Sequence, residues 1–203
     1  MKKIYNNTFH DIWIHSLNVS KYALLLGNEL NLDEYELKIL KIGGLLHDIG
    51  NLFIPEEILN KNSKLTNEEY EIIKKHPMIG ELLLPTNISK EIKEIVRNHH
   101  ERIDGNGYPD GLKNNEISYY IKIISIADAF DAMISKRSYN NVKTIDEALN
   151  ELYRCSIPMT NEKTKSMQQF DTNLVNIFIK AIKNNQSTIE HSNKIKYKDL
   201  KLY

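Results

Sequence analysis

The stretch HHERIDGNGYPDG at 99–111 places two adjacent histidines and a glutamate directly before a turn-forming run with three glycines and a proline. Apolar residues in the preceding EIKEIVRN recur at the spacing of one helix face, which predicts an amphipathic helix with His99 at the end of its buried face. His100 then lies about 100° around the same helix end. Because imidazole is a common metal ligand, two such side chains can converge on one ion.

A histidine and an aspartate, His47 and Asp48, follow another apolar run, Ile42 to Leu46. This position predicts an imidazole and a carboxylate at the inner end of a buried helix. A buried carboxylate without a partner is costly, and a metal cation is one of the few partners that compensate for the cost. Because a carboxylate can also bridge two ions, Asp48 is a candidate bridging ligand.

The apolar segment YYIKIISIADAFDAM contains a third acidic position, Asp128, which falls one turn after Ile124 on the face that should point into the core. Asp131 lies about one turn further along that face. Two interpretations of Asp128 remain open: a ligand in the same site, or a buried acid paired with Lys136 or Arg137.

Helix signals extend over nearly the whole chain, and strand signals are almost absent. Gly27 and Gly50 are candidate helix stops, and the expected helix starts are Thr8, Asp33 with Glu36, Thr66 with Glu69, Ser89, Thr144 with Glu147, and Asp171. We therefore predict an all-α fold, a single-domain helical bundle over residues 1–183. Residues 184–203 are polar and lysine-rich, which predicts a loosely ordered tail.

Composition limits the partners. Lys+Arg and Asp+Glu balance at 27 each, so the chain has no global positive field to gather a nucleic acid polymer or an anionic membrane. No apolar stretch has the length of a signal peptide or a membrane span, and the only cysteine is Cys155. These features predict a cytoplasmic protein. We expect any regulatory signal to come from a separate protein, and the sequence leaves the oligomeric state open.

Taken together, these motifs resemble the HD-GYP family of metal-dependent phosphohydrolases, from about His10 to Ile182. ILNKNSKLTNEE and QFDTNLV match the family's connecting segments. The matching site motifs are His15, His47-Asp48, His76-Pro77, His99-His100-Glu101-Arg102, Asp104-Gly105-x-Gly107-Tyr108-Pro109 and Ala127-Asp128-Ala129-Phe130-Asp131.

The resemblance implies a bundle of the HD-domain type with a metal centre in its core. It assigns His15, His47, Asp48 and Asp128 to one divalent ion, and Asp48, His76, His99 and His100 to a second. Iron or manganese is the expected metal. A third ion in some family members uses a glutamate at the position of Asp11, which lies one turn before His15; the alternative for Asp11 is an ordinary first-turn helix residue.

The implied activity is hydrolysis of cyclic di-GMP, or a related cyclic dinucleotide, to a linear dinucleotide and onward to GMP. His47, Asp48 and Asp128 would hold the catalytic centre, with a metal-bridging hydroxide as the nucleophile. Three alternatives remain open: a catalytically weakened cyclic-dinucleotide-binding or protein-interaction module, a phosphohydrolase for another nucleotide, and a diiron oxygenase.

The implied substrate contacts are Arg137, Asp131, Tyr108, Asn51 and Gly107. Tyr108 either orients the ligand or packs under its loop, and Gly107 would let the loop backbone approach the ligand. Glu101 either holds a metal-bound histidine or neutralises Arg102.

At two positions where the family carries a cationic residue that contacts substrate phosphate, this chain has a neutral residue. The residues at these positions are Asn51 and Asn140. The candidate replacements from nearby loops are Lys61, Lys113 and Lys143.

Overall fold

The computed structural model describes residues 2–135, 142–158, 168–187 and 189, and within these ranges the chain is helical with no strand. The all-α prediction is therefore confirmed. Among the described residues, no helix combines the length and hydrophobicity needed to cross a membrane. The elements are α1 (Lys2–Glu29), α2 (Glu34–Leu46), the short 3₁₀ helix η1 (Ile49–Phe53), α3 (Glu56–Leu59), α4 (Asn67–Ile73), α5 (His76–Leu83), α6 (Lys90–Asn98), α7 (Tyr119–Ile134), α8 (Ile145–Ser156) and α9 (Thr172–Asn184).

Local capping chemistry starts five of these helices where the sequence predicts. Reciprocal capping boxes open α2, α4 and α8, and single side-chain caps open α6 and α9; the capping residues are Asp33, Thr66, Thr144, Ser89 and Asp171. The prediction of a helix start at Thr8 is wrong, because α1 already begins at Lys2.

Neither Gly27 nor Gly50 ends a helix, so these two predictions are wrong. α1 continues two residues past Gly27, and α2 ends at Leu46. Gly50 lies inside η1, where an added Cβ would stand 1.9 Å from the carbonyl oxygen of His76. Gly50 therefore permits a close approach between η1 and α5, and this approach brings the segment after α2 against the start of α5.

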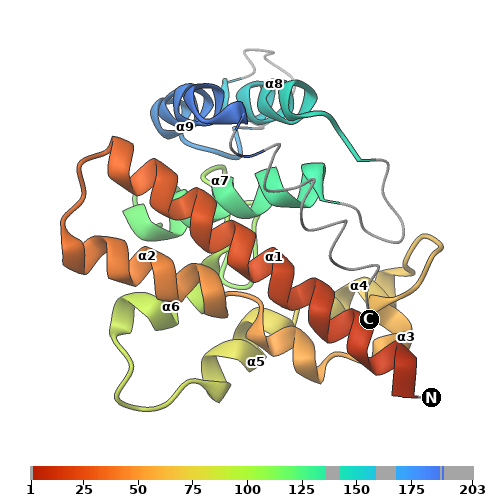
Figure 1. Cartoon of the computed structure of the whole chain (residues 1–203). Coiled ribbons are helices and arrows are strands. Elements are labelled where there is room, and N and C mark those ends of the chain that lie inside the picture. Colours follow the sequence, from red (N-terminus) through yellow and green to blue (C-terminus); the bar gives the residue numbers. More distant parts are fainter. Residues whose placement is uncertain (1, 136–141, 159–167, 188, 190–203) are drawn as a thin grey trace.

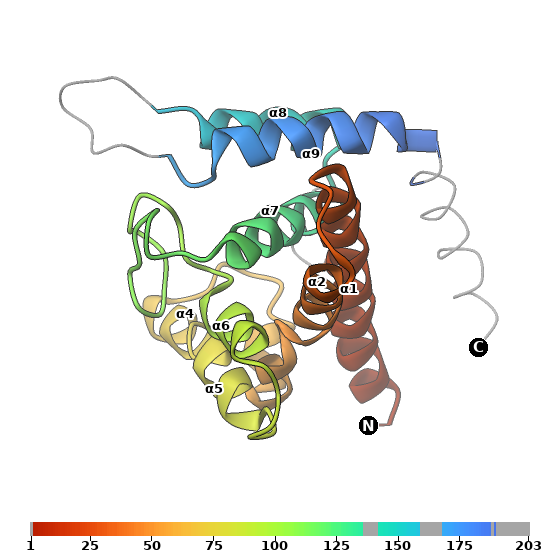
Figure 2. The same cartoon turned by 90° about the vertical axis from the view of Figure 1, so that its left-hand side faces the viewer.

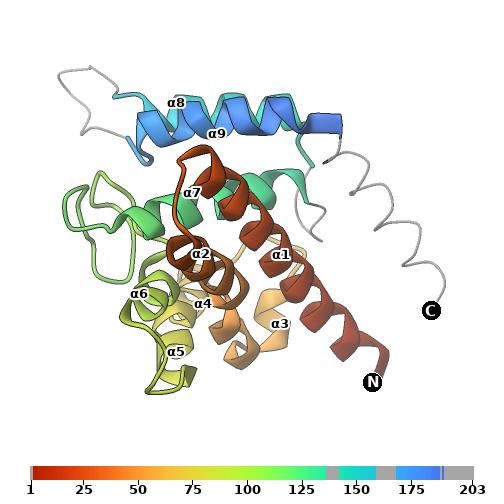
Figure 3. The ribbon, with the colours of Figure 1, turned by 60° about the vertical axis from the view of Figure 1, so that its left-hand side comes forward.

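The helices form a layered bundle (Figures 1 and 2). α8 and α9 lie side by side as one layer above α7, and α1 runs the length of the molecule against α2. The short helices α3 to α6 gather beneath α7 on the other side, as Figure 3 also shows. Helices that are far apart in the sequence thus surround the middle of α1 and α7.

α7 is the central helix of the core. Ten of its residues are buried, and its Phe130 stacks edge-to-face between Tyr22 of α1 and Phe178 of α9, with ring centroids 5.0 and 5.2 Å apart. This packing fixes α7 against α1, so polar groups on the two helices can meet at defined distances.

α9 ends at Asn184, one residue beyond the predicted end of the domain at residue 183. Ile189 nevertheless has a buried side chain in the core, so the chain contributes to the bundle beyond that boundary. Residues 188 and 190–203 of the predicted tail lie outside the described residues.

Candidate metal centre

Five segments bring imidazoles and carboxylates to one buried point in the bundle. His15 comes from the middle of α1, His47 and Asp48 from the end of α2, His76 from the start of α5, His99 and His100 from the end of α6, and Asp128 from α7. Six of the seven are less than 10% exposed, and His100 is half-buried. The metal-ligand residues predicted from the sequence therefore meet in space, with one exception, Asp11.

The first group of donor atoms surrounds Oδ2 of Asp48. This oxygen lies 3.7 Å from Nε2 of His15 and 3.6 Å from Nε2 of His47. Oδ1 of Asp128 lies 3.1 and 3.9 Å from the same two nitrogens. Ligands bound at about 2.1 Å around one ion are roughly 3.0–3.5 Å apart, so small inward movements would complete such a site.

The second group surrounds the other oxygen of the same carboxylate. Oδ1 of Asp48 lies 3.2 Å from Nε2 of His76 and 3.7 Å from Nε2 of His99, and a nitrogen of His100 belongs to the same set of atoms. Asp48 thus turns one oxygen to each group, which is the arrangement of a carboxylate that bridges two cations.

The imidazoles are oriented for metal binding by their outer nitrogens. Nδ1 of His47, His76 and His99 faces the carbonyl oxygen three residues earlier at 2.8, 2.8 and 3.0 Å. Because a carbonyl only accepts, Nδ1 carries the proton, and the lone pair of Nε2 points to the centre.

Two features of this arrangement fit a cation. Nε2 of His47 is buried without a hydrogen-bond partner. Nε2 of His76 and Nε2 of His99 face each other at 3.2 Å, a contact that a shared proton or a metal cation makes favourable. The cluster can therefore bind metal.

Charge states also favour a cation. Burial lowers the pKa of His47 to about 4 and holds the pKa of His100 well below its usual range, so both imidazoles are neutral bases near pH 7. Burial alone would raise the pKa of Asp48 and Asp128, but the surrounding histidines hold both well below the usual range. Ionised carboxylates beside the neutral His47 and His100 imidazoles form a donor set suited to a divalent ion.

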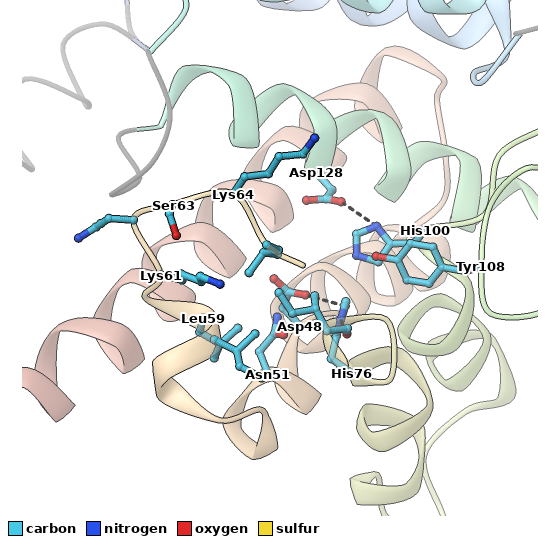
Figure 4. A pocket seen from close by; sticks show the side chains of 14 residues that line it. Asp48, Asn51, Leu59, Lys61, Ser63, Lys64, His76, His100, Tyr108 and Asp128 are labelled. Atoms are coloured by element: carbon cyan, nitrogen blue, oxygen red, sulfur yellow. Dashed lines mark hydrogen bonds and ion pairs between the residues drawn. The ribbon is translucent and has the colours of Figure 1, made fainter. Parts of the chain in front are cut away.

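The centre lies at the floor of a cavity of about 480 Å³ (Figure 4). Asp48, His76, His100 and Asp128 face it from one side. The segment 58–65, which runs from the end of α3 into the loop before α4, forms the opposite wall, and Asn51 and Tyr108 also line the cavity. The volume falls within the usual range for sites that bind small organic ligands.

Asp131 has a different role from the predicted one. Its side chain is fully buried, and its carboxylate accepts hydrogen bonds from Nδ1 of His15 at 2.7 Å and from Nδ2 of Asn18 at 2.8 Å. The prediction of a substrate contact is therefore wrong, because no surface of this group reaches the cavity. Asp131 instead orients His15. Asn18, which the sequence analysis missed, lies three residues after His15 and therefore on the same helix face.

Replacing Asp131 with asparagine is expected to weaken metal binding by roughly 10- to 100-fold, because the neutral amide no longer supports the basicity of His15. Competition between the protein and a fluorescent chelator for Mn²⁺ measures this affinity. The control is Asp146→Asn, the same change at an exposed position in the first turn of α8. Equal affinities in the two variants would contradict the role of Asp131.

Glu101 organises the loop that follows the two histidines. Its buried carboxylate accepts the backbone N–H groups of Asp110, Gly111 and Leu112 at 2.7, 3.0 and 3.0 Å. Among the described residues, no hydrogen bond or ion pair joins this carboxylate to a histidine or to the Arg102 guanidinium, which instead donates to the backbone carbonyl of Glu101 at 3.0 Å. Both predicted roles of the Glu101 side chain are therefore wrong.

Gly107 packs against the chain itself. A Cβ at this position would lie 2.4 Å from the backbone of Glu101 and of Arg102. Gly107 does not line the cavity, so it permits the loop to fold back on the end of α6 and does not bring backbone to a ligand.

Tyr108 combines both of its predicted features. Its ring packs on His100 with centroids 4.7 Å apart, and it also lines the cavity. Burial raises the pKa of its hydroxyl, which therefore stays protonated and can donate a hydrogen bond.

Three other predicted residues, Asp11, Lys113 and Lys143, belong to neither donor group and do not line the cavity. Asp11 is exposed and belongs to neither donor group. Lys113 does not line the cavity, and Lys143 forms an ion pair with Glu151 at 3.4 Å. Arg137, Lys136 and Asn140 lie outside the described residues.

The fold and the two donor groups define a class of protein: a helical bundle with a buried histidine and aspartate centre that can bind metal. The chain belongs to the HD domain family, whose model matches residues 3–156. The predicted resemblance to HD-GYP proteins is confirmed.

Two curated relatives and one solved structure support this assignment. The chain is 41% identical over 138 residues to the cyclic di-GMP phosphodiesterase response regulator RpfG of Xanthomonas campestris, covering 66% of this chain and 36% of the relative. It is 39% identical over 137 residues to 3'3'-cGAMP-specific phosphodiesterase 1 of Vibrio cholerae, covering 67% and 32%. The chain therefore spans about a third of each relative's length.

The solved structure is Bd1817, an HDG"Y"P protein from Bdellovibrio bacteriovorus. It superposes with a TM-score of 0.67 at 22% identity, over 85% of this chain and 52% of that one. This similarity shows the shared fold.

Proposed function

We propose that this chain is a metal-dependent phosphodiesterase that hydrolyses a cyclic dinucleotide, cyclic di-GMP or 3'3'-cGAMP, to the linear dinucleotide and, for cyclic di-GMP, onward to GMP. The observation that carries the proposal is Asp48, whose two oxygens face separate groups of imidazoles at the floor of an open cavity. The relatives named above act on these two messengers, which supports the substrate class.

The proposal includes two divalent ions, one held by His15, His47, Asp48 and Asp128 and one by Asp48, His76, His99 and His100. Imidazole and carboxylate ligands without thiolate suit iron or manganese. When bound, such ions neutralise the charge of a phosphodiester and lower the pKa of a water molecule beside it.

The chain's own residues position and protect this chemistry. Carbonyl groups of α2, α4 and α6 fix the tautomers of His47, His76 and His99, and Asp131 fixes that of His15. Tyr108 packs on His100, lines the cavity, and can donate its hydroxyl proton in a hydrogen bond to a phosphate or ribose oxygen. With only one cysteine, the chain can form no internal disulfide, which supports a cytoplasmic location.

Chromatography of products after incubation with each messenger tests the proposal, using protein purified without oxygen and analysed for metal. Linear dinucleotide should form with the metal-loaded protein and stop forming when a chelator removes the metal. Absence of product at full metal occupancy would contradict the proposal.

A second candidate function is a cyclic-dinucleotide-binding module without turnover. The observation that favours it is the neutral Asn51 in the cavity wall, at a position where the family carries a lysine. Binding of the messenger without product, at full metal occupancy, would establish this alternative.

A further inference from the structure

The wall of the cavity opposite the metal centre carries the positive charge that Asn51 does not supply. Apart from histidines, the cationic side chains among the described lining residues are Lys61 and Lys64. Both belong to the segment 60–66 that joins α3 to α4.

Lys61 forms an ion pair with Glu69 that stabilises this segment. Its Nζ lies 2.5 and 2.7 Å from the two carboxylate oxygens of Glu69, and the side chains of the pair are about one quarter exposed. The same carboxylate accepts the backbone N–H of Thr66 at 2.7 Å in the capping box that opens α4. Glu69 therefore links Lys61 to the start of α4 and neutralises the charge of Lys61.

Lys64 is the unpaired cation of this wall. Its side chain is exposed, and among the described residues its Nζ has no carboxylate within ion-pair distance. In Figure 4 it extends from the segment toward α7, on the side of the cavity where Asp128 lies. Glu69 binds Lys61 before Lys64 and the backbone N–H of Thr66 after it. These contacts hold the segment from which Lys64 projects.

We propose that Lys64 binds the second phosphate of a ligand whose first phosphate is at the metal centre. This inference rests on the proposed function. A cyclic dinucleotide carries two phosphodiesters on opposite sides of its ring, so when one is at the floor of the cavity the other points toward the wall. A lysine ammonium forms a charge-assisted hydrogen bond with such a phosphate. Lys64 then favours ligands with two phosphates over simple phosphodiesters.

The test compares the metal-loaded full chain with Lys64→Gln, Lys64→Arg and a matched control, Lys38→Gln, which makes the same charge change on α2 at an exposed residue that does not line the cavity. The substrates are cyclic di-GMP and bis(p-nitrophenyl) phosphate, which has a single phosphate. Lys64→Gln should raise the KM for cyclic di-GMP about tenfold with little change in kcat. It should leave the KM for bis(p-nitrophenyl) phosphate unchanged, and Lys64→Arg should restore the KM for cyclic di-GMP.

Other outcomes separate the two proposals. An unchanged KM in Lys64→Gln, or an equal rise in Lys38→Gln, would overturn the role of Lys64 and leave the proposed function intact. If the wild type forms no product from cyclic di-GMP, calorimetric titration of cyclic di-GMP decides on Lys64. The proposed function fails only if 3'3'-cGAMP also yields no product. About tenfold weaker binding by Lys64→Gln alone would support it, whereas equal binding, or no binding by the wild type, would overturn it.

Discussion

Asp48→Asn is expected to abolish metal loading and hydrolysis together. The amide has nearly the same shape as the carboxylate, but it carries no charge and offers only one oxygen to cations on two sides. Both donor groups depend on this residue, through Oδ2 toward His15 and His47 and through Oδ1 toward His76 and His99. We expect metal content to fall from about two ions per chain toward none, and hydrolysis to fall at least about a hundredfold.

Elemental analysis and product chromatography on the same preparations measure the two effects. Asp146→Asn on the exposed first turn of α8 is the control and should retain both metal and activity. Circular dichroism should show an unchanged helical spectrum for both variants. Hydrolysis by Asp48→Asn after removal of metal would show that the site lies elsewhere.

The second large effect is expected for Glu101→Ala, and it concerns stability. This substitution leaves three backbone N–H groups of the 110–112 segment without their buried acceptor. Because each hydrogen bond to a charged group contributes about 1.5–3 kcal/mol and water can reach part of this loop, we expect the free energy of unfolding to fall by about 3 kcal/mol or more.

Denaturant unfolding followed by circular dichroism measures this change. Glu116→Ala is the matched control, since its carboxylate accepts a single backbone N–H, that of Lys113, at 2.8 Å. The control should lose about 1 kcal/mol or less. A loss for Glu101→Ala no larger than that of the control would show that water replaces the carboxylate as acceptor and that the loop does not depend on Glu101.

Local chemistry explains why so much of the helix pattern was predictable. Asp33, Thr66 and Thr144 satisfy backbone N–H groups within three residues, so these helix starts depend on neighbours in the sequence. α1 shows the limit of such reasoning, because Thr8 has the chemistry of a cap but lies within a helix that begins earlier.

The metal-ligand residues were identifiable for a related reason. Imidazoles and carboxylates at the ends of apolar helix faces are costly to bury unless they share a partner. The sequence shows such residues directly after apolar runs with helical spacing, so it indicates that a partner is needed. The sequence was therefore sufficient to identify His47, Asp48, His99 and His100 as candidate metal ligands, while the resemblance to a family joined them with His15 and His76 in one centre.

Tertiary structure decided which polar residues support the centre and which ones face the ligand. Asp131 and Asp128 lie on the same buried face of α7, and only the packing of α7 on α1 turns Asp131 to Nδ1 of His15 and away from the cavity. Glu101 follows two histidines in the sequence, yet its partners are nine to eleven residues further on. Lys61 and Lys64 are equivalent by composition and differ because Glu69 neutralises only one of them. The identity of a buried donor follows from local patterns, whereas its partner depends on distances between helices that sequence spacing does not contain.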